Sequence, residues 1–387
     1  MKTRLNPLVR RPLGAVFCGL VLAWSITGSA VAALPNETTD LERLGRTLYF
    51  DPALSTPPGQ SCASCHTPSA GFADPNHNLP VSRGVLPGRT GFRNAPTAAY
   101  AKFIPPLYYD ADDETYVGGL FLDGRVNSLE EQAQMPLLNP LEMHNPDGAA
   151  VVAKVRKASY QSLFRKVFGA QALATNQEAA AYQQISQAIA AFERTPMFSP
   201  FTSKYDYYLQ GRAHLTPAEQ RGLRLFNGLA NCFACHPSEA ASGQPGPMFT
   251  DFTYDNIGIP KNWNDPYLKL SLDLNPDGPG FVDYGLANTV AQFDPEHAAD
   301  QAGRFRVPTL RNLTLTAPYG HNGYFKTLKD IVHFYNTRDV PSAGWPAGEV
   351  PATVNHDELG DLGLTEGEEN DLVEFLKTLT DGYRNVR

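Results

Sequence analysis

Two copies of the string Cys-x-x-Cys-His constrain this chain more than any other feature of its sequence. The copies are Cys62-Ala-Ser-Cys65-His66 and Cys232-Phe-Ala-Cys235-His236. Two thiols at this spacing can add to the two vinyl groups of one porphyrin, and the histidine that follows can reach its iron. The sequence therefore predicts two covalently attached haem c groups, with His66 and His236 as the proximal iron ligands.

Three other uses of paired cysteines fit the two strings less well. Structural disulfides are common in exported proteins, but they do not call for a histidine after each pair. A four-cysteine zinc site has its halves about 15–20 residues apart, far closer than here. A thioredoxin-like motif needs a βαβ setting that the flanking sequence does not suggest.

The first 32 residues have the order of a secretory signal peptide. Basic residues come first, an apolar run covers residues 13–26, and Ala30-Val-Ala32 resembles a cleavage site. The apolar run is shorter than the roughly 20 residues of a membrane span, although an uncleaved anchor is the alternative. We expect export to the periplasm and no membrane-spanning segment after processing. The fifth cysteine, Cys18, lies within this segment and would be removed with it.

The charge of the processed chain excludes one class of partner. Removal of the signal peptide takes the formal net charge from −8 to −12, because that segment holds four basic and no acidic residues. So acidic a protein is not expected to bind nucleic acid. It would favour a basic protein partner whose docking depends on salt, although the charge also serves solubility alone.

The segments before the two haem motifs resemble each other. Residues 44–50 and 222–226 both read as short helices that carry a glycine and an aromatic residue on one face. A weak repeat of this kind suggests two duplicated domains. Further apolar residues at helical spacing follow each motif, in residues 185–192 and 372–379, and Thr365 and Glu368 are spaced as a capping box.

These patterns predict a mainly α-helical protein. Strand-like alternation is hard to find, and the Pro- and Gly-rich residues 275–280 and 340–351 read as loops. Helix-breaking residues between Arg194 and Thr216 mark a boundary, and Thr216-Pro217 starts a new helix. We therefore expect two cytochrome c-like domains, residues 33–205 and 206–387, each enclosing one haem.

Several strings in order along the chain resemble those of the bacterial dihaem cytochrome c peroxidase and MauG superfamily. Besides the haem motifs, they are Leu48-Tyr-Phe-Asp-Pro-Ala-Leu-Ser55, Arg93-Asn-Ala-Pro-Thr97, Asp123-Gly-Arg125, Leu129-Glu-Glu-Gln-Ala133, Asn139-Pro-Leu-Glu-Met143, Pro308-Thr-Leu-Arg-Asn312 and Thr316-Ala-Pro-Tyr-Gly-His321. The resemblance implies that the haem of His66 reacts with hydrogen peroxide and that the haem of His236 transfers or stores charge.

The resemblance also implies an open iron site at the first haem. Many of these peroxidases carry a distal histidine in a Ser-x-Gly-His string, whereas this chain reads Ser82-Arg-Gly-Val85-Leu86. We expect a five-coordinate haem that needs no prior reduction, as in MauG. His77 is near in sequence and is the alternative ligand.

Motif positions further imply the residues that act on peroxide. Glu142 matches the catalytic glutamate of the family, Gln132 matches a distal glutamine, and Pro136 matches a distal-pocket proline. Cleavage of the peroxide bond needs a group that moves a proton between the two oxygens, and a carboxylate suits that task.

At the second haem, the resemblance implies that Tyr335 ligates the iron, as a tyrosine does in MauG, where the peroxidases use methionine. His333 is the competing ligand, but helical spacing places it on another face. A calcium ion between the domains would be bound by the Asn94 side chain and the carbonyls of Thr316 and Pro318, all of them oxygen donors.

One position departs from the family pattern. Relatives carry a tryptophan relay before the Asp-Gly-Arg string, but Leu122 stands here, and neither Trp263 nor Trp345 matches that position. The route between the haems could use Phe121 as a spacer, a tyrosine, or direct tunnelling.

Three functions are consistent with these features. The first is a peroxidase that takes electrons from a small periplasmic cytochrome c or cupredoxin. The second is a MauG-like enzyme that uses peroxide to oxidise side chains of a partner protein. The third is a dihaem electron carrier without peroxide chemistry, against which Gln132 and Glu142 argue. Family members are often dimers, so a homodimer is one expected assembly.

Overall fold

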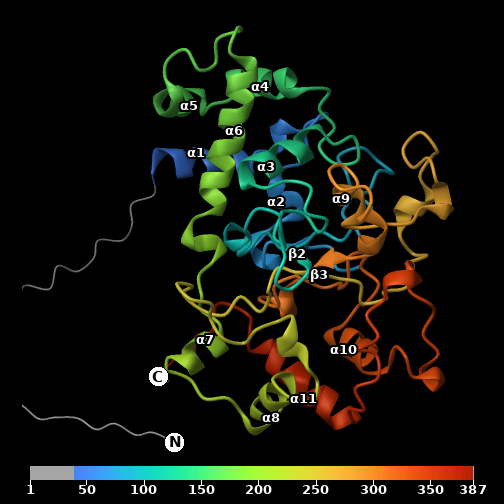
Figure 1. The fold of residues 1–387 in the computed structure, drawn as a ribbon. Coiled ribbons are helices and arrows are strands. Elements are labelled where there is room, and N and C mark those ends of the chain that lie inside the picture. Colours follow the sequence, from blue (N-terminus) through green and yellow to red (C-terminus); the bar gives the residue numbers. More distant parts are fainter. Residues whose placement is uncertain (1–38, 387) are drawn as a thin grey trace, which may run out of the picture. The chain divides into compact units, whose positions relative to one another are not determined.

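The computed structural model describes residues 39–386, and the predicted signal peptide, residues 1–32, lies outside them. The described chain consists mainly of helices and of the long loops that join them (Figure 1). Helices far outnumber strands, as the sequence predicts. The α-helices are α1 (Asp40–Tyr49), α2 (Cys62–Cys65), α3 (Leu129–Leu138), α4 (Gly148–Lys157), α5 (Gln161–Phe168), α6 (Glu178–Glu193), α7 (Lys204–Leu209), α8 (Pro217–Phe226), α9 (Ala287–Val290), α10 (Leu328–Thr337) and α11 (Glu366–Lys377).

Strands are few and short in the described residues. Strand β1 (Tyr108–Asp110) pairs antiparallel with β2 (Thr115–Val117), and β3 (Tyr254–Asp255) pairs antiparallel with β4 (Phe305–Arg306). The segments predicted as loops contain two 3-10 turns, at Gly278–Gly280 and Pro341–Ala343, which the sequence analysis did not anticipate.

Side-chain caps fix where the main helices begin. Thr39, Thr216 and Thr365 each accept a hydrogen bond from the backbone of the third helical residue, and each forms a full capping box. These bonds satisfy backbone N–H groups that have no partner inside the helix. The predicted helix start at Thr216-Pro217 and the predicted capping box at Thr365 are both confirmed.

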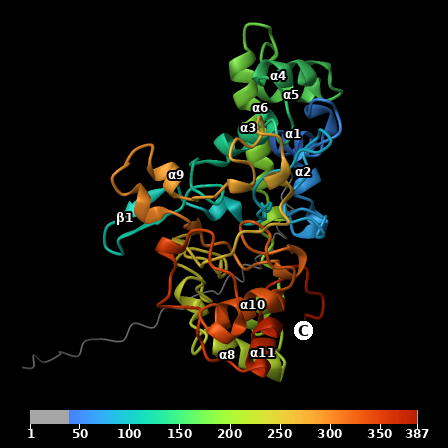
Figure 2. The same ribbon diagram turned by 90° about the vertical axis from the view of Figure 1, so that its right-hand side faces the viewer.

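The internal repeat predicted before each haem motif is visible as two matching helix crossings. Helix α1 packs on α6, and α8 packs on α11. Helix α10 lies beside the second pair (Figure 1 and Figure 2). A Cβ atom added at Gly45 would lie 1.8 Å from the carbonyl oxygen of Ala188, and one at Gly222 would lie 2.0 Å from that of Asp371. Only glycine therefore allows either helix pair to approach so closely.

The aromatic residues of the two crossings match as well. Tyr49 lies four residues after Gly45 and packs edge-to-face on Phe192 at 5.4 Å between ring centroids. Phe226 lies four residues after Gly222 and packs in the same way on Phe375 at 5.1 Å. Each half thus begins with a helix of the same design, which leads directly into its haem motif.

Two large hydrophobic clusters lie in the described chain. The buried members of one cluster lie between residues 44 and 198, with Met248 added, and those of the other lie between residues 205 and 379. Helix α7, which the sequence analysis did not foresee, contributes Tyr205 to the second cluster and Asp206 to a buried ion pair with Arg311 at 2.8 Å. The change from one cluster to the other occurs near residue 205, and the domain boundary expected there stays a prediction.

Candidate functional site

Each Cys-x-x-Cys-His motif opens onto its own cavity. Cys62, Cys65 and His66 line a cavity of about 210 Å³ in the N-terminal half. The second motif lines a cavity of about 290 Å³ in the C-terminal half, and the walls of this cavity are mainly apolar. Both spaces have the apolar lining and the few polar groups that suit a bound macrocycle.

The two motif histidines are oriented alike. The Nδ1 atom of His66 lies 3.1 Å from the carbonyl oxygen of Phe72, and that of His236 lies 2.8 Å from the carbonyl oxygen of Phe249. Donation from Nδ1 to a carbonyl leaves Nε2 as the free ligand atom. Both carbonyls belong to non-glycine residues with positive φ, 61° for Phe72 and 52° for Phe249. Such strained backbone persists only where the surrounding structure requires it.

The thiols and histidines also have the protonation that haem attachment needs. Burial raises the pKa of each motif cysteine, and burial lowers the pKa of His236 to about 4. The histidine is therefore neutral and able to bind a metal. None of the four cysteines forms a disulfide in the described chain, so all remain available for thioether bonds. These observations fit two haem c groups.

The residues expected to act on peroxide all line the N-terminal cavity. Gln132 and Pro136 lie four residues apart on α3, so they share a face. Glu142 follows in the loop after the helix, and its Oε1 accepts a 2.7 Å hydrogen bond from the side-chain amide of Asn139. Burial raises the pKa of Glu142, while the Asn139 bond and the charge of Arg125 oppose that rise.

A further carboxyl group in this cavity, that of Glu193, escaped the sequence analysis. Glu193 is 7% exposed, and its Oε2 has no hydrogen-bond partner in the described structure. Burial raises the pKa of Glu193 to about 8. A signal was present, since Glu193 continues the buried stripe of Ile185 and Ile189 at the same four-residue spacing.

Histidines other than His66 are absent from the lining of the N-terminal cavity, as far as the structure describes the chain. Ser82 lines the cavity, and its hydroxyl donates a hydrogen bond to Asp74. His77, the alternative ligand considered from the sequence, is exposed and does not contribute to the wall. This arrangement leaves the side of the cavity near Glu142 without a competing imidazole.

Tyr335 and His333 lie in different surroundings on α10. Tyr335 lines the C-terminal cavity together with His236. His333 is not part of the wall, and its Nδ1 lies 2.8 Å from a carboxylate oxygen of Glu369. Burial raises the pKa of the Tyr335 phenol well above its ordinary value, so a phenolate there would need a strong cation beside it.

Leu122 lines both cavities. It occupies the position at which the family resemblance led us to expect an aromatic relay. Neither described tryptophan reaches a cavity wall. Trp263 is 66% exposed, and Trp345 packs on Phe334 at 5.2 Å between ring centroids. Phe121 lines the N-terminal cavity, with the Arg125 guanidinium 3.5 Å above its ring.

The three residues expected at a calcium site come together near the C-terminal cavity. Asn94, Thr316 and Pro318 all contribute to its wall, and the Asn94 side-chain amide donates to the carbonyl of Pro318. The backbone N–H of Asn94 also donates to the carbonyl of His321 at 2.7 Å. The contacts bring an amide side chain and carbonyl oxygens together, which is the donor chemistry of calcium.

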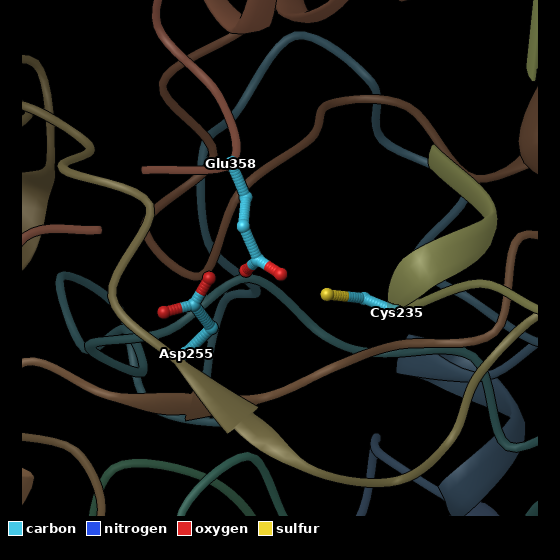
Figure 3. A group of neighbouring side chains, drawn as sticks. All are labelled: Cys235, Asp255 and Glu358. Atoms are coloured by element: carbon cyan, nitrogen blue, oxygen red, sulfur yellow. The ribbon is translucent and has the colours of Figure 1, made fainter. Parts of the chain in front are cut away.

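A group of potential metal ligands lies beside the second haem motif. Cys235, Asp255 and Glu358 place one ligand atom each within 4.8 Å of one another. Figure 3 shows the Glu358 carboxyl group between the Asp255 carboxyl group and the sulfur of Cys235. Because that sulfur forms a thioether once haem is attached, it no longer offers the thiolate that a metal site needs. The two acids then place negative charge next to the attachment edge of the second haem.

Comparison with known proteins places these features in a family. The family model described as di-haem cytochrome c peroxidase matches residues 39–214. The chain is 38% identical to the methylamine utilization protein MauG of Paracoccus denitrificans over 383 residues, which cover 95% of each chain. It is 31% identical to the cytochrome-c peroxidase IdrP1 of Denitromonas iodatirespirans over 352 residues, which cover 89% of this chain and 82% of that one.

Solved structures of a diheme peroxidase and of a MauG-like protein have a similar fold. The diheme peroxidase BthA of Burkholderia thailandensis superimposes with a TM-score of 0.78 at 36% identity, covering 88% of this chain and 86% of that one. A MauG-like protein associated with microbial copper homeostasis superimposes with a TM-score of 0.64 at 30% identity, covering 93% and 96%. The fold is therefore shared with a diheme peroxidase.

Proposed function

The chain belongs to the di-haem cytochrome c peroxidase and MauG family, and we propose that it reduces hydrogen peroxide at the N-terminal haem. The observation that carries this proposal is the position of Glu142, half-buried in the wall of the cavity that holds the first attachment motif. A pure electron carrier has no use for an acid–base group at that place. When bound, the haem supplies the iron to which peroxide binds and the redox chemistry that breaks its O–O bond.

Glu142 would move the proton that this reaction needs. Its carboxylate accepts a proton from one peroxide oxygen and returns it to the other, which then leaves as water. Asn139 holds Oε1 of Glu142 through the 2.7 Å bond and so orients the carboxyl group. Gln132 lines the same wall and offers an amide that can hydrogen-bond peroxide, while Pro136 lines it without a backbone N–H of its own.

The absence of a second histidine from the described wall supports an open site that reacts without prior reduction. The test is rapid mixing of the fully oxidised protein with one equivalent of hydrogen peroxide, followed by absorbance. We expect a fast spectral change. A protein that stays inert until one haem is reduced would contradict the open site, and one that stays inert even then would be an electron carrier.

A second function is favoured by Tyr335. Its place in the wall of the cavity that His236 also lines, and the 38% identity to MauG, support a MauG-like oxidation of side chains in a partner protein. As an oxygen ligand, Tyr335 would lower the potential of the second haem relative to a thioether ligand. Under this function, the protein retains oxidising equivalents in the absence of a donor. Under the first function, a reduced small redox protein restores the resting absorbance at once.

The electron donor would be a small basic cytochrome c or cupredoxin. Exposed Glu358 and the nearby Asp255 lie beside Cys235, where the second haem is attached, and they offer negative charge to such a protein. We place the mature enzyme in the periplasm, after removal of residues 1–32. Among the described residues, no helix has the length and apolar character that crossing a bilayer requires.

A calcium ion bound by Asn94, Thr316 and Pro318 completes the proposal. The contact of the Asn94 amide with the Pro318 carbonyl supports it, because a cation there would draw both oxygens inward after rotation of the amide. The ion would tie a loop of the N-terminal half to a loop of the C-terminal half.

A further inference from the structure

The two haem cavities share part of their walls, and one charged side chain stands in the shared part. Leu122 and Arg306 line both cavities, as do Asn94 and several small or apolar residues around it. Among these described residues, only Arg306 carries a charge. Arg306 therefore lies where the walls of the two candidate haem cavities meet.

The backbone holds Arg306 firmly in this place. Strand β4 pairs with β3 so that Arg306 lies opposite Tyr254. The backbone N–H of Arg306 donates to the carbonyl of Leu122 at 2.9 Å, which fixes the strand against the segment between the cavities. Both links are made by the main chain, so the position does not depend on what the side chain binds.

The side chain itself has no adequate partner. Arg306 is 7% exposed, and its Nε atom has no hydrogen-bond partner in the described structure. One terminal nitrogen donates a long bond of 3.4 Å to the carbonyl of Phe121. No described carboxylate lies within ion-pair distance of Arg306. The nearby Asp123 is already bound by Arg93 and Arg125, at 2.7 Å each.

Two other arginines with little exposed surface have the carboxylate partners that Arg306 lacks. Arg93 is bound to both Asp283 and Asp123, and Arg311 is bound to Asp206 through two nitrogens. A buried guanidinium cannot lose its proton at ordinary pH, and leaving it unpaired is strongly unfavourable. Arg306 therefore requires an anion that the described polypeptide does not provide.

We infer that Arg306 binds propionate carboxylates of both haems and forms a positively charged bridge between them. Each haem c brings two propionates, and the cavities that hold the haems share the wall from which Arg306 projects. A planar guanidinium presents five N–H donors in a fork, so it can serve two carboxylates at once, whereas a lysine is a single point charge.

The bridge has an electrostatic consequence for both haems. A buried positive charge next to a haem favours the reduced iron, which carries one positive charge fewer than the oxidised iron. Loss of the charge should therefore lower both reduction potentials together. Because one charge stabilises the reduced iron of both haems, it couples their reduction potentials. This coupling does not require an aromatic residue at position 122.

The test is a spectroelectrochemical titration of the two-haem protein with Arg306→Met, Arg306→Lys and the control Arg125→Met. Arg125 lines only the N-terminal cavity and already has a carboxylate partner. We expect Arg306→Met to lower both potentials, Arg306→Lys to keep most of the original values, and Arg125→Met to leave the C-terminal haem unchanged. An Arg306→Met variant that changes neither potential, or only one, overturns the bridge.

Haem content and far-UV circular dichroism are measured for each variant, so that a loading defect is not taken for a shift in potential. If Arg306→Met does not load haem, Arg306→Gln keeps two N–H donors without the charge and must give the same joint decrease. These titrations use no peroxide. The bridge can therefore fail while the proposed peroxide chemistry stands, and the reverse also holds.

Discussion

Replacement of Glu142 by glutamine tests the proposed proton-transfer group most directly. The change keeps the volume of the side chain, and its amide oxygen can still accept the 2.7 Å bond from Asn139, so the cavity wall stays intact. A positioned general acid–base contributes about 10²–10⁴-fold to a rate, which corresponds to about 3–5 kcal/mol of activation free energy. We expect the rate of peroxide consumption, measured by stopped-flow absorbance at neutral pH, to fall by that factor.

Glu193 provides a matched control in the same cavity. Its carboxyl group lies close enough to Tyr49 to help raise the pKa of that phenol, and the Tyr49 hydroxyl donates to the carbonyl of His66. This position places Glu193 toward the attachment motif. Glu193→Gln should therefore retain most of the peroxide rate. If Glu193→Gln abolishes the reaction and Glu142→Gln does not, the assignment of Glu142 is wrong.

The pH dependence of the same rate gives a second check on Glu142. Burial raises the pKa of this carboxyl group, so the proton-accepting carboxylate is lost as the pH falls through that raised value. The rate should therefore decline on the acid side at a pH above the ordinary range of a glutamate. Because the Asn139 bond lowers the pKa of Glu142, Asn139→Ala should move this decline to still higher pH. A decline that stays in place would show that another group controls it.

Three further predictions concern the helix crossing, the second haem and the calcium site. Gly222→Ala should destabilise the protein by about 1–3 kcal/mol in denaturant titrations, because its Cβ would overlap a backbone carbonyl, whereas Gly280→Ala, in open space, should not. Tyr335→Met should raise the reduction potential of the C-terminal haem, because a thioether favours the reduced iron, and His333→Ala should leave it unchanged. A calcium chelator should lower the thermal unfolding temperature of the unmodified protein but have little effect on Asn94→Ala, in which the ion is already lost.

Local signals in the sequence were sufficient for several parts of the structure. The start of α8 follows from Thr216 and Pro217, because capping and a proline at the first helical position are properties of neighbouring residues. The helix face that carries Gly45 and an aromatic residue was foreseen, but its crossing with the helix of Ala188 was not. Helix α7 was missed because six residues carry too few apolar positions to show a period.

The residues of the candidate site also differ in whether neighbouring sequence was enough to predict them. Cys62, Cys65 and His66 are contiguous, so their spacing alone predicts a haem, and the second motif repeats that information. Glu142 was found only through a motif, since nothing local distinguishes it from a solvated acid. Glu193 was missed although it continues an apolar stripe.

By itself, the sequence determined the helical fold class and the attachment of two haems, because both depend on chemistry between residues close together in the chain. Only the tertiary structure decided which residues, distant from the attachment motifs in sequence, line the haem cavities. It separates Tyr335 from His333 by the partners that each contacts, and it brings Arg306 beside Leu122, 184 positions away in sequence, at the wall between two cavities. Burial and charge pairing arise only when distant segments pack together, so no pattern of neighbouring residues could reveal the unpaired cation at Arg306.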